Sequence, residues 1–429
     1  MPRLPGPRFA TDCTIDVDGR PVAARTGESV AVALLAAGRA LITRSSKYHR
    51  PRGAFCLAGS CHACLARVDG VPNQRTCRVP CRPGLSVESQ NALPSAPHDV
   101  LGAVDHLYAH GLDHHHLMTW NSLANRAAVA FSRRLAGAGT LADGTPSRSP
   151  PPSDERFEAV VVGGGPAGLA AAEALARSGR RVLLADAEPA LGGRLRCTLS
   201  REGPPLSWAA EVARSVSAAG GTAALGHTAF GVWRDGESFL VPFRAEGPGA
   251  PILLARTPRL LLATGTCAVP PLFARNDLPG IFAARGLARA LVEDGLVAGE
   301  RALVLGAGPE CEATAELLAE SGMDVRAARE VQSAHGALRL DGATLAGGDR
   351  MACDTLAFAG PRAPAADLAR LAGASVSLDP ASGGWFVRAG AGGATGVPGL
   401  RVAGEVVARV NAAEAAAAGR LAGEAAHAD

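Results

Sequence analysis

The chain has 429 residues, of which 47% are hydrophobic and 19% charged, and its formal net charge is +3. This length and composition suffice for two or three globular domains, and so small a net charge argues against nucleic acid as a general partner. The N-terminus lacks the apolar core of a signal peptide, and the apolar stretch at residues 31–42 is too short and too charged to form a transmembrane segment. We therefore expect a cytoplasmic chain, in which clustered cysteines are more often metal ligands or redox groups than disulfides.

The first predicted elements are two strands and a helix. Residues 13–25 alternate apolar and polar side chains around an Asp18-Gly19 turn, which is typical of a hairpin. Residues 27–39 then predict a helix that ends near Gly38. Two strands followed by a crossing helix are how a β-grasp domain begins, so we predict an α/β fold with such a domain over residues 1–95.

Four cysteines follow with the spacing C-x4-C-x2-C-x12-C, and they are Cys56, Cys61, Cys64 and Cys77. Thiolates are ligands for either a tetrahedral zinc ion or an iron–sulfur cluster. Zinc ligands are usually paired on two separate knuckles, whereas three of these cysteines lie in one short loop, as in a plant-type [2Fe–2S] site. We predict a [2Fe–2S] cluster and keep zinc as the alternative.

The residues around these cysteines favour the cluster. Small residues at positions 58–60 and 63 would let the backbone approach the sulfides closely and donate N–H groups to them. Residues 65–76 predict a strand, a turn at Asp69-Gly70 and a return strand, which would carry Cys77 back to the loop. Cys81 lies outside the pattern and is expected to be a small buried hydrophobe.

A connecting segment and linker is predicted over residues 96–156. Residues 144–158 contain four prolines with interspersed serines, a composition that resists both helix and sheet. Three consecutive histidines, His114, His115 and His116, precede it, and we favour a loop between domains over a metal site there.

A strand, a glycine-rich turn, a helix and a second strand follow the linker. β-branched residues 160–162 lead into the turn, and the second strand ends at Asp186. The glycines would let the backbone approach a pyrophosphate at the helix N-terminus, and Asp186 would bind the ribose hydroxyls. A dinucleotide-binding fold is predicted because all these elements occur in the right order. The turn residues are Gly163, Gly165, Pro166, Ala167 and Gly168.

Three later segments indicate which dinucleotide binds. They are "ALGGRL" with Gly193 and Arg194, "LLLATG" with Thr264 and Gly265, and "VPGLRVAGEV" with Gly404 and Glu405. These segments resemble those of the two-dinucleotide-binding-domain flavoproteins. The resemblance implies FAD, with the ATG turn near it and Glu405 on its ribityl chain, and a FAD-binding domain in two parts, residues 157–275 and 366–429.

In that family a second nucleotide-binding domain is inserted, and residues 276–365 are the candidate. Gly306 and Gly308 repeat the turn, but Cys311 replaces the third glycine and Arg329 stands where an acid would bind ribose. Only about 25 residues separate Arg329 from the strand that begins near Cys353, roughly half of what a complete nucleotide domain has. We interpret this domain as trimmed and leave NAD(P), another nucleotide and a structural remnant open.

The remaining cysteines argue against disulfide-reductase chemistry. Cys197, Cys267, Cys311 and Cys353 are isolated in sequence, and the paired cysteines that disulfide reductases carry beside the flavin do not occur. Each of the four is expected in the core.

The N-terminal part resembles a narrower family. Residues 44–77, and "KYHRPRG" at 47–53 above all, resemble the sarcosine oxidase α-subunit group and its relatives, which are electron-carrying subunits of hydrogen cyanide synthase, opine oxidases and D-hydroxyproline or proline dehydrogenases. The segments "DHHHLMTW" and "LAGAGTL" are similar to the connecting segment of that group. No folate-binding domain and no second cysteine-rich domain follow, so complete sarcosine oxidase α-subunit activity is not expected and a single cluster is.

The resemblance implies a flavo-iron–sulfur electron-transfer subunit of a multi-subunit FAD-dependent amine or amino-acid dehydrogenase or oxidase. A D-amino-acid-oxidase-like β subunit would oxidise the substrate, this chain would pass electrons between FAD and the cluster toward a downstream acceptor, and FMN at a subunit interface is a further cofactor that the group allows. The basic residues 44–52 would line that interface or contact a cofactor phosphate. Two alternatives stay open: a stand-alone NAD(P)H-dependent flavin reductase that feeds its own cluster, and a zinc-binding scaffold without enzymatic activity.

Overall fold

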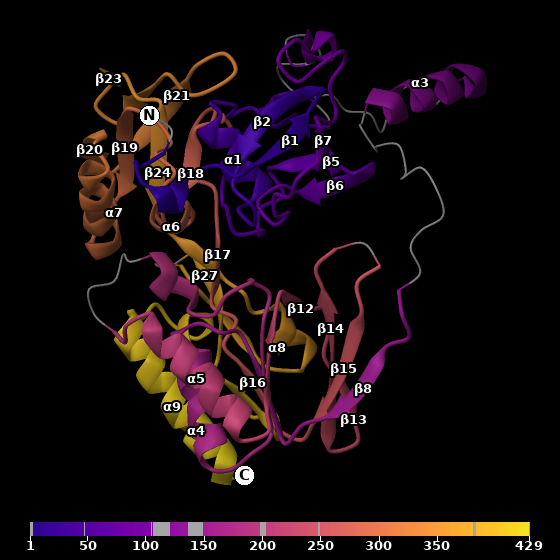
Figure 1. Ribbon diagram of the computed structural model, residues 1–429, viewed down its shortest axis with the longest axis vertical. Coiled ribbons are helices and arrows are strands. Elements are labelled where there is room, and N and C mark those ends of the chain that lie inside the picture. Colours follow the sequence, from indigo (N-terminus) through magenta and orange to yellow (C-terminus); the bar gives the residue numbers. More distant parts are fainter. Residues whose placement is uncertain are drawn as a thin grey trace. The chain divides into compact units, whose positions relative to one another are not determined.

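The computed structural model describes residues 3–46, 48–103, 105, 121–135, 149–197, 203–247, 249–380 and 383–428. The chain divides into two compact units (Figure 1). Unit 1 is Met1–Gly144 with Pro270–Gly360, and unit 2 is Thr145–Val269 with Pro361–Asp429. The region around the second glycine turn therefore belongs to the same unit as the cysteine-rich N-terminal residues.

The N-terminal part of unit 1 is the predicted β-grasp fold. Its sheet has the order β2-β1-β7-β5-β6, with β1 parallel to β7 and the other neighbours antiparallel. Asp18 and Gly19 have φ angles of 52° and 73°, as the two-residue hairpin turn between β1 and β2 requires. The elements are β1 (Cys13–Val17), β2 (Arg20–Ala24), α1 (Val30–Ala36), β3 (Thr43–Arg44), β4 (Pro51–Arg52), β5 (Leu65–Val68), β6 (Val71–Arg75) and β7 (Ser86–Glu88), with 3-10 turns at Pro7–Phe9 and Val100–Gly102 and helix α3 (Ser122–Leu135).

The rest of unit 1 is a small Rossmann-like fold. Its parallel sheet has the order β18-β24-β19-β20. The short connection noticed in the sequence holds only an antiparallel meander, β21-β22-β23, in place of further helices. The elements are β18 (Ile281–Ala283), α6 (Ala284–Asp294), β19 (Arg301–Gly306), α7 (Pro309–Glu320), β20 (Asp324–Ala328), β21 (Val331–His335), β22 (Gly342–Leu345), β23 (Arg350–Met351) and β24 (Thr355–Ala359).

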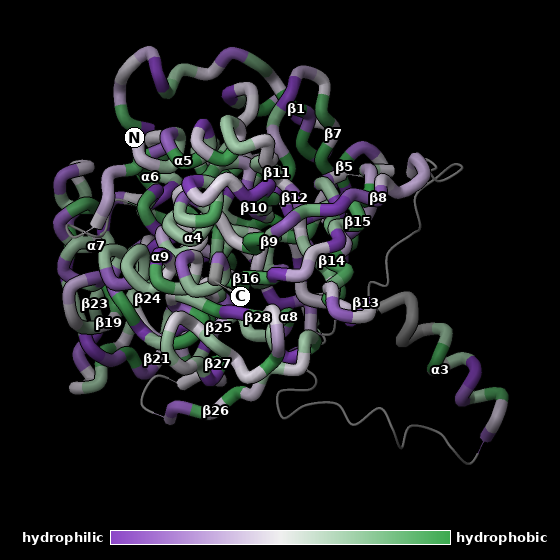
Figure 2. The backbone as a smooth tube through the Cα atoms, turned by 90° about the horizontal axis from the view of Figure 1, so that it is seen from below, coloured by the Kyte–Doolittle hydropathy of each residue, from purple (hydrophilic) through white to green (hydrophobic). Residues whose placement is uncertain are grey.

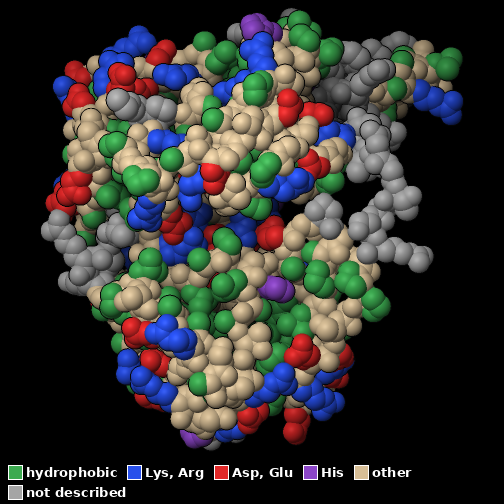
Figure 3. Space-filling view, in the orientation of Figure 1, with side chains coloured by type: hydrophobic (Ala, Val, Ile, Leu, Met, Phe, Trp, Pro, Cys, Tyr) green, Lys and Arg blue, Asp and Glu red, His purple; other side chains and the backbone are tan. Residues whose placement is uncertain are grey.

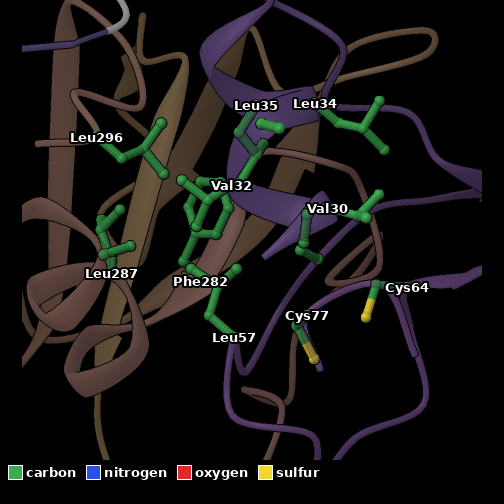
Figure 4. Packing of buried hydrophobic residues seen from close by; sticks show 14 of the residues in the cluster. Val30, Val32, Leu34, Leu35, Leu57, Cys64, Cys77, Phe282, Leu287 and Leu296 are labelled. Carbon is green, nitrogen blue, oxygen red and sulfur yellow. The ribbon is translucent and has the colours of Figure 1, made fainter. Parts of the chain in front are cut away.

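These two parts of unit 1 share one hydrophobic core. Val32 and Leu35 of α1 belong to the same buried cluster as Phe282 of β18 and Leu287 of α6, and Figure 4 shows Phe282 beside Val32. Leu57, from the cysteine loop, is part of the same cluster. Because the side chains interdigitate, the two parts form one packing unit and not two independent domains.

Gly286 in α6 lies against the backbone of the cysteine loop. A Cβ at this position would lie 2.2 Å from the carbonyl oxygen of Cys56. In a helix, Gly→Ala normally stabilises by about 1 kcal/mol. For Gly286→Ala we expect the opposite sign, a loss of about 1–3 kcal/mol, because the backbone has to shift.

Thermal unfolding of Gly286→Ala checks this expectation. Gly102→Ala is the matched control, because a Cβ there meets nothing within 4 Å. A melting temperature of Gly286→Ala equal to or above that of the unchanged chain would show that the contact is not tight.

Unit 2 is a second Rossmann-like fold around a parallel sheet of order β11-β10-β9-β16-β28. The strands β9 and β16 are fully buried, and Figure 2 shows their hydrophobic colouring. Helices α4 and α9 pack closely, since a Cβ at Gly419 would lie 1.9 Å from the carbonyl oxygen of Ala167. The elements are β9 (Ala159–Val162), α4 (Pro166–Arg177), β10 (Val182–Asp186), α5 (Ser207–Ala218), β11 (Thr222–Leu225), β16 (Leu260–Leu262), β28 (Leu400–Val402) and α9 (Ala412–Ala428), with 3-10 turns at Gly193–Cys197, Ala391–Gly393 and Gly404–Val406.

A second sheet of unit 2 corrects the predicted linker. Residues Ser153–Arg156 form strand β8, which pairs in parallel with β15, although the proline-rich composition predicted neither helix nor sheet. The prolines lie before this strand, so its backbone N–H groups remain free to pair. The other strands of this sheet are β12 (His227–Ala229), β13 (Trp233–Asp235), β14 (Ser238–Ala245) and β15 (Ile252–Thr257). The remaining elements of unit 2 are β17 (Thr266–Ala268), β25 (Arg362–Pro364), α8 (Asp367–Leu371), β26 (Val376–Asp379) and β27 (Gly384–Val387).

The surface carries both signs of charge. Figure 3 shows basic and acidic side chains intermixed on the visible face, as the small net charge leads one to expect. No helix in the described part of the chain has both the length and the apolar character needed to cross a lipid bilayer.

Candidate functional site

The four predicted cluster ligands lie together in unit 1. Cys56, Cys61 and Cys64 belong to the loop between β4 and β5, and Cys77 follows β6. Thr76 brings Cys77 to the loop, because its N–H and its hydroxyl donate to the carbonyl oxygen of Cys64 at 3.0 and 2.8 Å. In Figure 4 the sulfur atoms of Cys64 and Cys77 point to the same side of the fold.

The four thiols interact in one row, in the order Cys61, Cys56, Cys77 and Cys64. Cys56 forms a hydrogen bond with Cys61, Cys64 forms one with Cys77, and a further bond joins Cys56 to Cys77. The bonds from Cys61 and Cys77 lower the pKa of Cys56, and the bond from Cys77 lowers the pKa of Cys64 to about 7. The same bonds raise the pKa of Cys61 and Cys77. Two of the thiols are thereby predisposed to become thiolates, the form that binds metal.

The loop fits a [2Fe–2S] cluster in two respects. Such a cluster takes four protein thiolates, and the four cysteines lie within interaction range of one another. The N–H groups of Ala58 and Ser60 point at Cys56 Sγ from 3.4 and 3.3 Å, and N–H donors of this kind tune cluster sulfurs. Among the described residues, His, Cys, Asp and Glu form no group of three or more that is placed to hold a single metal ion.

Three arginines contact this loop, and no motif in the sequence predicts them. Arg75 donates to the carbonyl oxygen of Gly59 at 2.6 Å, and the side chain of Arg78 packs against Gly59. Arg289 of α6 donates to the carbonyl oxygen of Leu57. Arg75 and Arg78 are close to the cysteines in sequence, but Arg289 is far along the chain and only the shared core brings it to the loop.

Arg44, Arg50 and Arg52 form contacts within unit 1. The guanidinium of Arg44 is buried and donates to the carbonyl oxygens of Ala96 and His49 at 2.7 and 2.9 Å. Burial lowers the pKa of Arg44. His49 Nδ1 in turn lies 2.9 Å from the buried carboxylate of Asp99. Two further ion pairs are Arg50 with Asp105 and Arg52 with Asp277.

The first glycine turn in unit 2 has the geometry of a dinucleotide site. Gly163 has a φ of 106°, and a Cβ there would lie 2.3 Å from the carbonyl oxygen of Ala263. A Cβ at Gly168, in the first turn of α4, would lie 1.7 Å from the carbonyl oxygen of Gly163. Gly165 is the residue that caps α4, with Pro166 and Ala167 next in the helix. The turn is therefore tight enough to bring the backbone to a pyrophosphate at the helix N-terminus.

Asp186 lies at the end of β10, where the sequence predicts the ribose-binding acid. Its carboxylate accepts hydrogen bonds from the N–H groups of Gly164 and, at 2.7 Å, of Glu188. Burial raises its pKa. The acid is thus fixed beside the glycine turn, in the position that the fold uses for ribose hydroxyls.

The other predicted FAD residues converge on the same turn. Gly193 and Gly404 approach it, since a Cβ at Gly193 would lie 2.9 Å from Gly165 Cα and one at Gly404 would lie 2.8 Å from Ala167 Cβ. Arg194 and Glu405 form an ion pair of 3.1 Å, with about 15% of each side chain exposed. The ATG turn is tied to the residue after β25, because Thr264 donates its hydroxyl to Ala365 and the Ala365 N–H donates to Gly265, at 2.7 and 2.9 Å.

The second glycine turn keeps glycines with positive φ angles, but an acidic residue lies in the first turn of the helix that follows. Gly306 and Gly308 have φ angles of 148° and 84°, and Cys311 is buried at the position of the third glycine. Glu310, in the first turn of α7, pairs with Arg285 of α6 at 2.8 Å. A carboxylate there competes with a phosphate for the helix N-terminus, which disfavours a nucleotide. No motif in the sequence marks this ion pair.

Most of the remaining cysteines are buried, as expected. Cys81, Cys197, Cys311 and Cys353 are in the core, and Cys267 is partly exposed. Burial raises the pKa of Cys81 to about 12 and that of Cys353 to about 11. The expectation for His114, His115 and His116 falls outside the described residues.

Comparison with known proteins finds a family match in each of the two regions where the sequence predicts a cofactor site. Residues 10–92 match the model of the 2Fe-2S iron-sulfur cluster binding domain, and residues 161–221 match that of the NAD(P)-binding Rossmann-like domain. The structure of L-proline dehydrogenase from P. horikoshii superposes with a TM-score of 0.75 at 21% identity, covering 96% of this chain and 72% of that one. The same fold therefore extends over nearly the whole chain.

Two curated relatives give the family. The chain is 31% identical over 342 residues to sarcosine oxidase subunit alpha of Rhizobium meliloti, which covers 74% of this chain and 34% of the relative, so the chain spans about a third of that protein. It is 41% identical over 85 residues to hydrogen cyanide synthase subunit HcnA of Pseudomonas aeruginosa, covering 20% of this chain and 81% of HcnA. The prediction from residues 44–77 is confirmed: the chain belongs to the family of sarcosine oxidase alpha subunits and HcnA.

Proposed function

We propose that this chain is the electron-transfer subunit of a multi-subunit, FAD-dependent amine or amino-acid dehydrogenase or oxidase. The observation that carries the proposal is that one chain holds both a four-thiol loop and a glycine turn of the dinucleotide-binding type. FAD exchanges two electrons at once and a [2Fe–2S] cluster one, so a chain with both groups can turn an electron pair into two single electrons. A downstream acceptor would take them in two steps.

Named residues would hold each group. Cys56, Cys61, Cys64 and Cys77 would bind the two irons, with two thiolates on each. The FAD pyrophosphate would lie on the N-terminus of α4, and Asp186 would accept from the ribose hydroxyls. Arg194 and Glu405 would orient the ribityl chain as a pair, since each fixes the other. The other residues of this FAD site would be Gly163, Gly165, Pro166, Ala167, Gly168, Gly193, Thr264, Gly265 and Gly404.

The burial of the cysteine loop supports an exit for electrons at its outer rim. Ala58 and His62 are exposed, Cys61 is partly exposed, and Cys56 and Cys64 are buried. Electron transfer to another protein requires one side of a cluster to lie near the surface. We therefore assign this rim to the acceptor.

The substrate site is assigned to a partner. Two relatives are, by name, subunits of larger enzymes. A D-amino-acid-oxidase-like β subunit with its own flavin would remove two electrons and two protons from an amine, imino-acid or opine substrate, and this chain would receive the electrons directly or through FMN at the interface. Copurification followed by mass spectrometry identifies that partner.

An absorbance spectrum before and after dithionite, with iron, sulfide and flavin analysis, tests the proposal. We expect flavin peaks together with a broad iron–sulfide band that bleaches on reduction. A colourless chain that contains zinc would overturn the proposal in favour of the scaffold. Rapid reduction of the isolated chain by NAD(P)H would overturn it in favour of the stand-alone reductase, which the position of Glu310 disfavours.

A further inference from the structure

Helix α6 contacts three consecutive carbonyl groups of the cysteine loop. Ala283, which caps the helix, donates its N–H to Phe55 at 2.9 Å. Gly286 lies against the carbonyl oxygen of Cys56, and Arg289 donates to that of Leu57. The three contacting residues are spaced by three positions, so they form one ridge of the helix. The loop backbone around the first ligand is therefore fixed by α6.

Positively charged side chains lie close to the cysteine loop. The guanidinium of Arg289 is on the α6 side, and those of Arg75 and Arg78 are at Gly59. The N-terminal end of α6 also lies at the loop, where Ala283 donates its N–H to Phe55. Arg289 is only partly exposed, so water screens its charge less than that of a surface arginine.

We infer that Arg289 is a positioning residue that holds the Leu57 segment against α6 and raises the reduction potential of the cluster. The inference rests on the proposed [2Fe–2S] cluster. Adding one electron makes the cluster more negative, so a nearby cation stabilises the reduced state more than the oxidised state. The small Rossmann-like part of unit 1 thereby acquires a role that does not depend on binding a nucleotide: it supplies α6 to the cluster.

Potentiometric titration of the full chain, followed by EPR or visible absorbance, tests the inference. At the midpoint potential of the unchanged chain, we expect the ratio of reduced to oxidised cluster in Arg289→Gln to fall about tenfold, which is 59 mV for a one-electron couple. Arg289→Lys keeps the charge without the planar fork and should recover most of the loss. Arg326→Gln is the matched control, because it removes the same charge from an exposed site on β20 in the same unit.

Each outcome is decisive. A full cluster content with an unchanged potential in Arg289→Gln overturns the inference, and so does an equal shift in Arg326→Gln, which would make the effect one of net charge. If Arg289→Gln loses its cluster, the anchoring role is supported, and Arg289→Lys then decides the role of charge. A tenfold fall in the ratio of reduced to oxidised cluster in Arg289→Lys would overturn the role of charge. Absence of iron and sulfide from the unchanged chain would instead refute the proposed function.

Discussion

Gly168→Ala is expected to abolish flavin binding and to leave the iron–sulfur spectrum intact. The added Cβ would lie 1.7 Å from the carbonyl oxygen of Gly163, a backbone atom that cannot move without opening the turn. Opening the turn withdraws the N–H groups that would meet the pyrophosphate. We expect the flavin content per chain to fall more than tenfold, measured by absorbance of the released flavin.

Gly390→Ala is the matched control for this experiment. It lies in the same unit, its φ of −90° suits alanine, and the nearest atom to an added Cβ is 3.8 Å away. Circular dichroism checks that both variants fold. Purification of Gly168→Ala with a full complement of FAD would show that the first glycine turn is not the flavin site.

Cys61→Ser is expected to have the reciprocal effect. It removes one of four thiolate ligands and leaves an oxygen that is a poorer ligand for cluster iron, so the cluster should be lost while FAD stays bound. Iron and sulfide analysis measures the loss, and flavin content is the internal reference.

Cys81→Ser is the control for the ligand assignment. Cys81 is buried in the same core, but it takes no part in the interactions that join the four thiols. The cluster should persist in this variant. Retention of iron and sulfide in Cys61→Ser, or their loss in a folded Cys81→Ser, would contradict the assignment of the four ligands.

The sequence by itself determined the elements that short-range sequence patterns specify. The Asp18-Gly19 hairpin, the helix before Gly38 and the strand–turn–helix after residue 158 were predictable because turn residues and hydrophobic periodicity act over a few positions. The four cysteines were recognisable for the same reason. Their spacing sets which thiols can meet, and the structure brings all four together.

Only the tertiary structure decided how these pieces are combined. Residues 270–360 share a core with the N-terminal fold, and this places Arg289 on the cysteine loop and fixes Gly286 against Cys56. The pairing of Glu310 with Arg285, the burial of Arg44 and the strand Ser153–Arg156 depend likewise on distant partners. Packing of buried surface between segments far apart in the chain leaves no periodic trace in either segment, so these contacts could not be read from the sequence.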